Sequence, residues 1–398
     1  MPELQPDSSL HLSRSWLLDP SVLHLNHGSF GATPLEVRAV QDQWRQRLEA
    51  NPTHFMTEEY EPAIDQARQR LALLIGAEPA DLVFVANATT AINAVVRSLS
   101  LAPGDELLTT DHAYNACRNV LDYAAARSGA DVVTARIPFP LSSPDEVIEP
   151  LLDAVTSRTR FALIDHVTSA TGLIMPVDRI VASLEQLEIE VLVDGAHAPG
   201  MLPLDVTALG CSYYAGNNHK WLCSPKGSGF LWVRPDRAGS LVPPVISHGW
   251  NDPRRSRPRL HLLFDYMGSN DPSAHLAVPA AIEFLTSLYP VGLVGFMEAN
   301  RQLALKARDL ICTALGVPEP APASMIGALA TIPLPDSTGE PTPELNDPLT
   351  RTLYERHRIQ VPVFLWPGWP RRHVRVSAMP YNSPDQYEQL VTALRTEL

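Results

Sequence analysis

The sequence predicts an α/β protein with a mostly parallel sheet, joined to a smaller α+β domain. Two observations lead to this prediction. Between about residues 80 and 235, short apolar runs rich in β-branched residues alternate with helical patterns, which is typical of a parallel sheet with helices on both faces. In the last third of the chain, a long helical stretch is followed by short strands.

Two helices are expected before the first strand. In the first, Thr33 can cap the helix and Pro34 can occupy its first helical position. Apolar residues then recur on one face of it, at Val37, Val40, Trp44 and Leu48. The second helix ends at Gly76 and has its apolar face at Tyr60, Ile64, Ala67, Leu71 and Leu74.

Strand and helix signals then follow in order. The predicted strands of the sheet are DLVFVAN, DELLTTD, DVVTARI, RFALIDHV, EVLVDGA and GFLWV. After these come a helical stretch over 277–315, strands around 328–334 and 373–377, and a closing helix from Asp385. We therefore expect a large domain at residues 20–255 and a small α+β domain made of residues 1–19 and 256–398.

Composition excludes several classes of function. The chain has 31 Lys and Arg against 44 Asp and Glu, a formal charge of −13, which disfavours nucleic acid or an anionic membrane as the main partner. The basic run PRRSRPR, Pro253–Arg259, is either a solvated loop or a lip that gathers anions.

Cysteine and histidine spacing predicts no metal site. The four cysteines are scattered without a CxxC pair, and His24 and His27 lack a third ligand at zinc-like spacing. The N-terminus has no apolar segment of the secretory type, and no run approaches eighteen apolar residues. We therefore expect a cytoplasmic protein in a reducing compartment.

Polar residues follow the predicted strands. In an open parallel sheet, ligands bind outside the carboxyl ends of the strands. The segments at these ends are NATTAIN, DHAY, TSATG and DGAHA, and GNNHKW precedes the last strand. They are expected to bring together Thr89, His112, Ser169, Asp194, His197, His219 and Lys220.

These residue types fit one cofactor. NATTAIN places backbone N–H groups and hydroxyls at a helix N-terminus, where a phosphate can bind. A carboxylate can keep a pyridine nitrogen protonated, and a lysine can form a Schiff base with an aldehyde. A ring that carries an aldehyde, a basic nitrogen and a phosphate is pyridoxal 5′-phosphate (PLP), which we predict as the cofactor.

Four motifs in order carry a resemblance to a known family. They are NHGSFGATP, VDGAHAPG, NNHKWLCSPKGSGFLWV and RVSAMPYNSPDQ, and they span about residues 25–390. The chain resembles the class V aminotransferase family of PLP enzymes, within it most of all isopenicillin N epimerase and its relatives. This resemblance implies the fold type I, aspartate aminotransferase-like fold.

The resemblance also implies roles at the cofactor. Lys220 would form the Schiff base and move the substrate α-proton, and Asp194 would pair with the pyridinium nitrogen. His197 and Ser169 would bind the phenolic oxygen of the ring. The phosphate would be held by Ala88, Thr89, Asn217 and His219, with Thr90 as a further candidate.

Other implied roles concern the ring face, the substrate and a second subunit. Family members place either a histidine at His112 or a tyrosine at Tyr114 against the ring, and both are kept as catalytic candidates. Arg375 would grip the substrate carboxylate. Ser269, in GSNDPS, would reach the cofactor phosphate of a partner subunit, which implies a homodimer with shared active sites. The remaining candidates on the substrate side are Asn26, His27 and Asn382.

The reaction itself stays open at this stage, because epimerisation, β-elimination and transamination all begin with removal of the α-proton. A desulfurase is disfavoured because Val361–Val374 lacks the cysteine such enzymes use. The first hypothesis is an isopenicillin N epimerase-like enzyme acting on an amino acid or an aminoadipoyl-type peptide. The alternative is a carbon–sulfur lyase acting on a cysteine conjugate, followed by an aminotransferase and a non-catalytic PLP-binding dimer.

Overall fold

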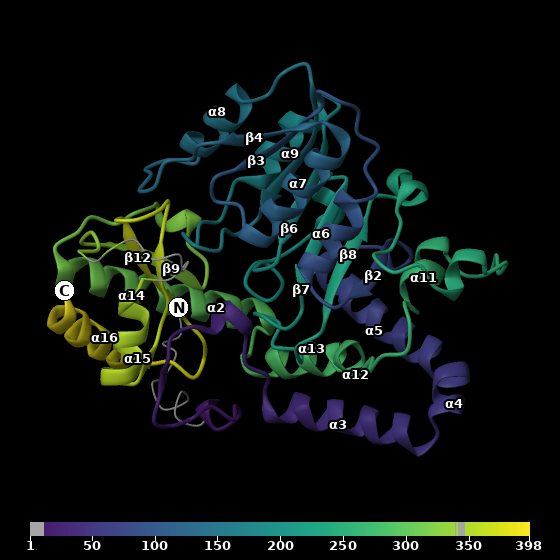
Figure 1. Ribbon diagram of the computed structural model, residues 1–398. Coiled ribbons are helices and arrows are strands. Elements are labelled where there is room, and N and C mark those ends of the chain that lie inside the picture. The colour runs from purple at the N-terminus through teal and green to yellow at the C-terminus, as the bar shows by residue number, and fades with distance from the viewer. Residues whose placement is uncertain (1–11, 339, 341–346) are drawn as a thin grey trace.

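The computed structural model describes residues 12–338, 340 and 347–398 (Figure 1). Residues 1–11 of the predicted small domain therefore lie outside the described residues. The chain is built around a seven-stranded sheet, whose strands in spatial order are β2 (Leu82–Val85), β8 (Gly229–Val233), β7 (Tyr213–Asn217), β6 (Glu190–Gly195), β5 (Thr159–Asp165), β3 (Glu106–Thr110) and β4 (Asp131–Ala135).

The sheet is mostly parallel, as predicted. Strands β7, β6, β5, β3 and β4 run parallel to one another, and β8 runs antiparallel to both β2 and β7. Strand β7 was missing from the sequence prediction. Its sequence YYAGN has tyrosines and small residues in place of an aliphatic β-branched run, so it lacks the pattern by which the other strands were found.

Except at the edge strand β4, both faces of the sheet are buried, which explains the continuous apolar runs of its strands. Side chains alternate along β2: Leu82 and Phe84 enter one core, and Val83 and Val85 enter the other. The first core also contains residues of α5 (Tyr60–Ile75), α8 (Asp145–Asp153) and α9 (Val177–Glu185). The second contains residues of α6 (Ala88–Val96), α7 (Asn115–Ser128) and α11 (Arg259–Phe264) (Figure 1).

A second, antiparallel sheet lies in the C-terminal part of the chain. Its order is β11 (Val363–Leu365), β12 (Arg372–Ser377) and β9 (Leu329–Leu334). It packs against α14 (Leu293–Leu315), which in turn packs on α16 (Pro384–Glu397) (Figure 1). The N-terminal part joins this region through β1 (Leu23–His24), which pairs with β10 (Ile359–Gln360) beside α15 (Leu349–His357).

The remaining helices refine the predictions. The stretch predicted as one helical region is divided into α12 (Ser273–Leu276), α13 (Val278–Ser287) and α14. Helix α3 (Leu35–Ala50) has Pro34 at its N-cap, so the prediction that Thr33 caps it was wrong: the Thr33 hydroxyl donates to the Ser224 carbonyl. The short helices are α2 (His27–Phe30), α4 (Pro52–His54) and α10 (Val206–Leu209).

The predicted domain boundary at residue 255 stays a prediction. Helices α12 and α13, which were assigned to the small domain, pack against α3 and α5 of the predicted large domain. Leu276 of α12 and the buried apolar residues of α13 belong to the same core as those of α5.

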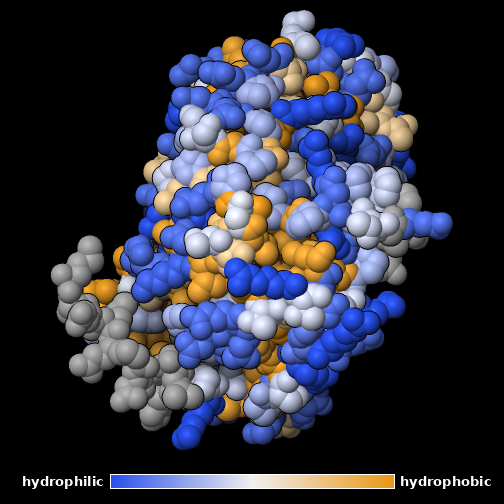
Figure 2. Space-filling model, turned by 90° about the vertical axis from the view of Figure 1, so that its left-hand side faces the viewer, coloured by the Kyte–Doolittle hydropathy of each residue, from blue (hydrophilic) through white to orange (hydrophobic). Residues whose placement is uncertain are grey.

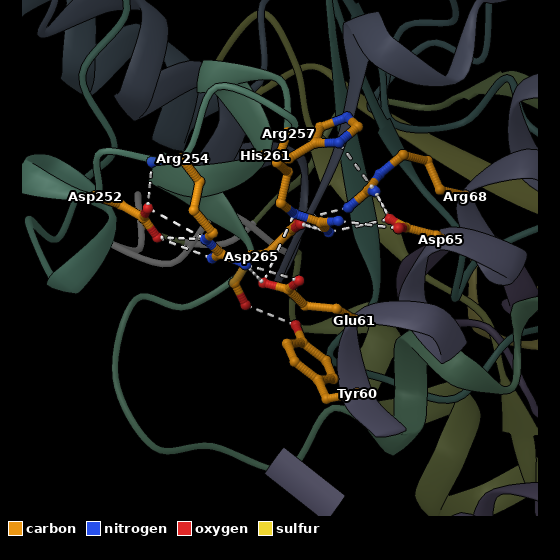
Figure 3. A network of polar contacts seen from close by, with 9 residues as sticks. All are labelled: Tyr60, Glu61, Asp65, Arg68, Asp252, Arg254, Arg257, His261 and Asp265. Atoms are coloured by element: carbon orange, nitrogen blue, oxygen red, sulfur yellow. Dashed lines mark hydrogen bonds and ion pairs between the residues drawn. The ribbon is translucent and has the colours of Figure 1, made fainter. Parts of the chain in front are cut away.

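The basic run Pro253–Arg259 is engaged in ion pairs (Figure 3). Arg257 binds Asp65 of α5 at 2.9 Å and Asp265 at 2.6 Å, and Arg254 binds Glu61 at 2.9 Å. Arg68, whose side chain is 1% exposed, binds the same two aspartates. Because these carboxylates already hold two guanidinium groups, the network ties the run to α5, and this favours the interpretation of the run as a loop over that of an anion-gathering lip.

Within the described part of the chain, no helix is both long and apolar enough to cross a membrane. Figure 2 shows one side of the molecule, on which hydrophilic side chains predominate and apolar ones gather in small groups.

Candidate active site

A cavity of about 250 Å³ opens at the carboxyl ends of the parallel strands. Its walls come from the end of α2, the start of α6, the segment before α7, the ends of β5, β6 and β7, and the segments that follow these three strands. The structure therefore brings together nine of the predicted site residues, as the rule for open parallel sheets predicts: Ala88, Thr89, Tyr114, Ser169, Asp194, His197, Asn217, His219 and Lys220.

Two buried carboxylates lie side by side at this edge of the sheet. Asp165 ends β5, and it is in register with Asp194 on the neighbouring strand β6. Both line the cavity. Asp165 was missed in the sequence analysis because it was counted as part of its strand, although its position at the strand end was a signal that could have identified it.

The environment of these carboxylates raises their pKa values. Burial raises the pKa of Asp194, and burial together with the neighbouring Asp194 raises the pKa of Asp165 well above its usual range. Asp194 accepts hydrogen bonds from the Ala196 backbone N–H at 3.0 Å and from the Cys117 thiol at 3.2 Å. A group that carries a positive charge is therefore favoured next to this pair.

Lys220 is held from two sides. Its Nζ lies 3.0 Å from Nε2 of His197, and its backbone carbonyl accepts a hydrogen bond from His27 at 2.9 Å. Burial, with a smaller contribution from the charge of Arg375, lowers the pKa of the amine to about 8. An amine with this pKa is partly neutral near neutral pH, which is the state that attacks an aldehyde or takes a proton.

Gly31 allows the chain after α2 to approach the lysine. Its φ is +70°, and a Cβ at this position would collide with the backbone carbonyl of His219. Only glycine fits both the left-handed conformation and this close approach. The motif NHGSFGATP therefore has a structural reason to contain this glycine.

The N-terminus of α6 forms one end of the cavity. Asn87 caps the helix by accepting from the Thr90 backbone N–H at 2.9 Å, and Asn217 accepts from the Ala88 backbone N–H at 2.8 Å. Among the described residues, no hydrogen bond involves the Thr89 hydroxyl. The start of this nine-residue helix, with its partial positive charge, is suited to an anion such as a phosphate.

Arg375 enters the site from the second sheet. Its guanidinium donates to the Ser169 carbonyl at 2.5 Å and to the Ser29 hydroxyl at 3.2 Å, so it touches two residues of the cavity wall. The residue is buried, no carboxylate of the described residues pairs with it, and its Nε has no partner. Burial lowers its pKa to about 10. A buried arginine without a counter-ion is prepared to bind an anion.

Besides Arg375, six predicted residues lie outside the cavity wall. His112 is buried with Nδ1 2.7 Å from the Thr171 hydroxyl and Nε2 3.1 Å from the Ile137 carbonyl, whereas Tyr114 lines the cavity and is 48% exposed. Of the two candidates for the ring face, Tyr114 is therefore the one that the geometry favours. The Thr90 hydroxyl donates to Asn87, and Asn26 accepts from Arg375 at 3.3 Å.

The other three have contacts elsewhere. His27 lies behind the Lys220 backbone and is bonded to the Tyr381 hydroxyl at 2.8 Å. Asn382 binds the His24 carbonyl and Gln386, so it holds the loop before α16 and does not touch Arg375 through any described hydrogen bond. Ser269 is exposed and contacts the Tyr266 hydroxyl. Its predicted contact with a partner subunit stays a prediction.

The donor set of the cavity fits PLP. The α6 N-terminus can receive the phosphate, and the pair Asp165 and Asp194 can receive a protonated ring nitrogen. The Lys220 amine can bond to the aldehyde, with His197 as a donor beside it.

Comparison with known proteins supports this interpretation. The family model described as Aminotransferase class-V matches residues 31–253, more than half of the chain. The chain is 38% identical to isopenicillin N epimerase of Amycolatopsis lactamdurans, over 95% of this chain and 96% of that protein. It is 29% identical to a probable chloroplastic L-cysteine desulfhydrase of Arabidopsis thaliana, over 94% of this chain and 83% of that protein.

A solved structure shows the same fold. It is a C-DES mutant with glycine covalently linked to its PLP cofactor, with a TM-score of 0.78 and 20% identity, covering 94% of this chain and 96% of that one. The fold, the family and the cofactor that the sequence analysis predicted are thus confirmed. The chain belongs to the class V aminotransferase family of PLP-dependent enzymes.

Proposed function

We propose that this protein is an isopenicillin N epimerase-like enzyme, which removes the α-proton of an amino acid or an aminoadipoyl-type peptide so that the α-carbon is reprotonated on the opposite face. One observation carries the proposal: the buried amine of Lys220, with its lowered pKa, lines the cavity, and the buried guanidinium of Arg375, which no described carboxylate pairs with, contacts two residues of its wall. The first suits proton transfer and the second suits a carboxylate, so together they describe an amino-acid site.

The residues of the cavity divide the work. When bound, the cofactor supplies an electron sink for the carbanion at the substrate α-carbon. Arg375 holds the substrate carboxylate through its guanidinium, and the neutral Lys220 amine accepts the α-proton on one face of the α-carbon. Epimerisation then requires a second acid, which stays unassigned, to deliver a proton to the opposite face. Asp194 keeps the ring nitrogen protonated, because a carboxylate in a buried site favours a cation beside it. Tyr114 borders the substrate space near Arg375.

The second candidate function is a carbon–sulfur lyase. All four cysteines are buried, and burial raises the pKa values of their thiols, so none is placed to attack sulfur as a thiolate. This argues against persulfide chemistry but leaves β-elimination open, since that reaction needs only α-proton removal and a leaving group. A relative named as a desulfhydrase, 29% identical, supports keeping it.

The proposal includes a homodimer and a cytoplasmic location. The exposed Ser269 lies outside the cavity of its own chain, as expected for a residue that serves a partner subunit.

A product assay distinguishes the two candidates. The purified protein, loaded with PLP, is incubated with an aminoadipoyl peptide and, separately, with cysteine S-conjugates, and the products are separated by chiral chromatography. The proposal predicts that the peptide is converted to an approximately equal mixture of the two epimers, without loss of carbon or sulfur. Release of a keto acid and a thiol from the conjugates, with the peptide unchanged, would establish the lyase in its place.

A further inference from the structure

Trp221 follows Lys220 in the chain but lies behind the cavity wall. Its indole Nε1 is 3.1 Å from Nδ1 of His197, and Nε2 of the same imidazole is 3.0 Å from Nζ of Lys220. The three side chains thus form one chain of hydrogen bonds that ends at the reactive amine. We propose that Trp221 is a positioning residue, which fixes the tautomer of His197 and thereby holds the Lys220 amine as a neutral hydrogen-bond acceptor.

The direction of each bond follows from the donors available. An indole N–H can only donate, so Nδ1 of His197 must carry a lone pair. The single proton of the neutral imidazole is then on Nε2, which faces Lys220. This Nε2–H needs an acceptor at Nζ, and only the neutral amine has a lone pair to offer. If Lys220 were an ammonium group, its N–H would face the Nε2–H of His197, and two donors would lie against each other.

His197 is kept neutral by its surroundings. Burial, with a smaller contribution from the charge of Arg375, lowers the pKa of His197 well below its usual range, and a charged Lys220 would lower it further. A doubly protonated imidazole would also turn an N–H toward the indole N–H of Trp221. The geometry and the charge environment therefore agree on the same state.

Trp221 is a rigid donor because the structure holds it from several sides. Its side chain is fully buried, and its ring lies 5.1 Å from the ring of His27, centroid to centroid. At Gly200, where φ is +83°, a Cβ would approach the Trp221 backbone to 2.5 Å, so the chain there packs directly on this residue. The indole cannot swing away without disturbing these contacts.

The test begins with the apoprotein, so that it depends neither on the cofactor nor on the proposed reaction. Protein labelled with ¹⁵N-histidine is studied by long-range ¹H–¹⁵N NMR, and the His197 signal is assigned from a His197→Gln variant. Above the pKa of Lys220, which is about 8, the expected result is an unprotonated Nδ1 and a protonated Nε2. A protonated Nδ1 in the wild-type protein would overturn the proposal, whatever the variants do.

A second measurement uses Trp221→Phe, which keeps a ring and removes the N–H. His197 can then place its proton on Nδ1 and accept from the ammonium of Lys220, which stabilises the charged amine. The rate at which the apoprotein incorporates PLP covalently should rise with pH through about 8 in the wild type. In the variant, the pH at the midpoint of this rise should increase by about one unit. The rate of incorporation near pH 7 should therefore fall by about tenfold.

Trp232→Phe is the matched control. Trp232 is also buried, and its indole Nε1 has no hydrogen-bond partner among the described residues, so its replacement should change neither the His197 tautomer nor the midpoint. The other charged or titratable groups near the amine are Arg375, Asp194, Asp165, Cys117 and His219, and neither variant alters them. An unchanged His197 tautomer or an unchanged midpoint in a folded Trp221→Phe protein would overturn the proposal. If the enzyme does not catalyse the proposed reaction, the His197 tautomer measured in the apoprotein is unaffected, so the two failures can be told apart.

Discussion

Replacing Lys220 with alanine is expected to lower turnover by at least about 10⁴-fold, because the residue is both the covalent anchor of the cofactor and the group that moves the α-proton. The variant should retain no cofactor after borohydride reduction and denaturation, whereas the wild type should retain one per chain. Mass spectrometry of the peptide containing residue 220 measures this directly.

Lys226→Ala is the control for this prediction. Lys226 lies six residues further on, is exposed, and donates to the Gly31 carbonyl at 2.9 Å. Its loss should leave covalent cofactor and activity close to wild type. Covalently held cofactor in Lys220→Ala would show that another amine is the anchor, and the assignment of the site would be wrong.

Replacing Arg375 with alanine is expected to raise KM for substrates that carry an α-carboxylate by about 100-fold. A charged hydrogen-bonding contact contributes about 1.5–3 kcal/mol, and about 3 kcal/mol corresponds to about 100-fold in binding. Arg375→Lys should recover only part of this loss, since lysine cannot form the two parallel hydrogen bonds. Steady-state kinetics on both variants provide the measurement.

Arg371→Ala provides the comparison for this arginine. Arg371 is exposed and precedes β12, so its replacement should leave KM within about twofold of wild type. A KM unchanged in Arg375→Ala would show that the carboxylate binds elsewhere in the cavity. A fall in cofactor content, with KM unchanged, would point to a structural role for Arg375.

The elements with strong patterns could be predicted from sequence. Aliphatic runs such as the one that forms β6 identified most of the sheet, and its C-terminal edge correctly placed Asp194 and His197 beside Lys220. Strand β7 was not predicted, because its burial in the sheet, and not its own composition, makes it a strand. The predicted start of α3 was wrong by one residue. The Thr33 hydroxyl, which was expected to cap this helix, donates instead to the Ser224 carbonyl.

The direction in which side chains point also could not be predicted from the sequence. His112 and Tyr114 are two residues apart, and only the folded chain shows that Thr171 and Ile137 hold His112 away while Tyr114 lines the cavity. The role of Trp221 depends on a distance to His197 across 24 residues of sequence. Arg375 was identifiable by its motif, but the absence of a paired carboxylate among the described residues is a property of the fold.

The central claim is that Lys220 removes the α-proton of a substrate held by its carboxylate. Proton NMR of the PLP-loaded enzyme in D₂O, with aminoadipoyl peptides, L-amino acids and cysteine conjugates, tests it most directly. The account predicts that the α-proton signal of at least one substrate disappears with the wild type and persists with Lys220→Ala. If substrates bind, as shown by a change in the cofactor spectrum, and yet deuterium never enters the α-carbon, the claim is contradicted.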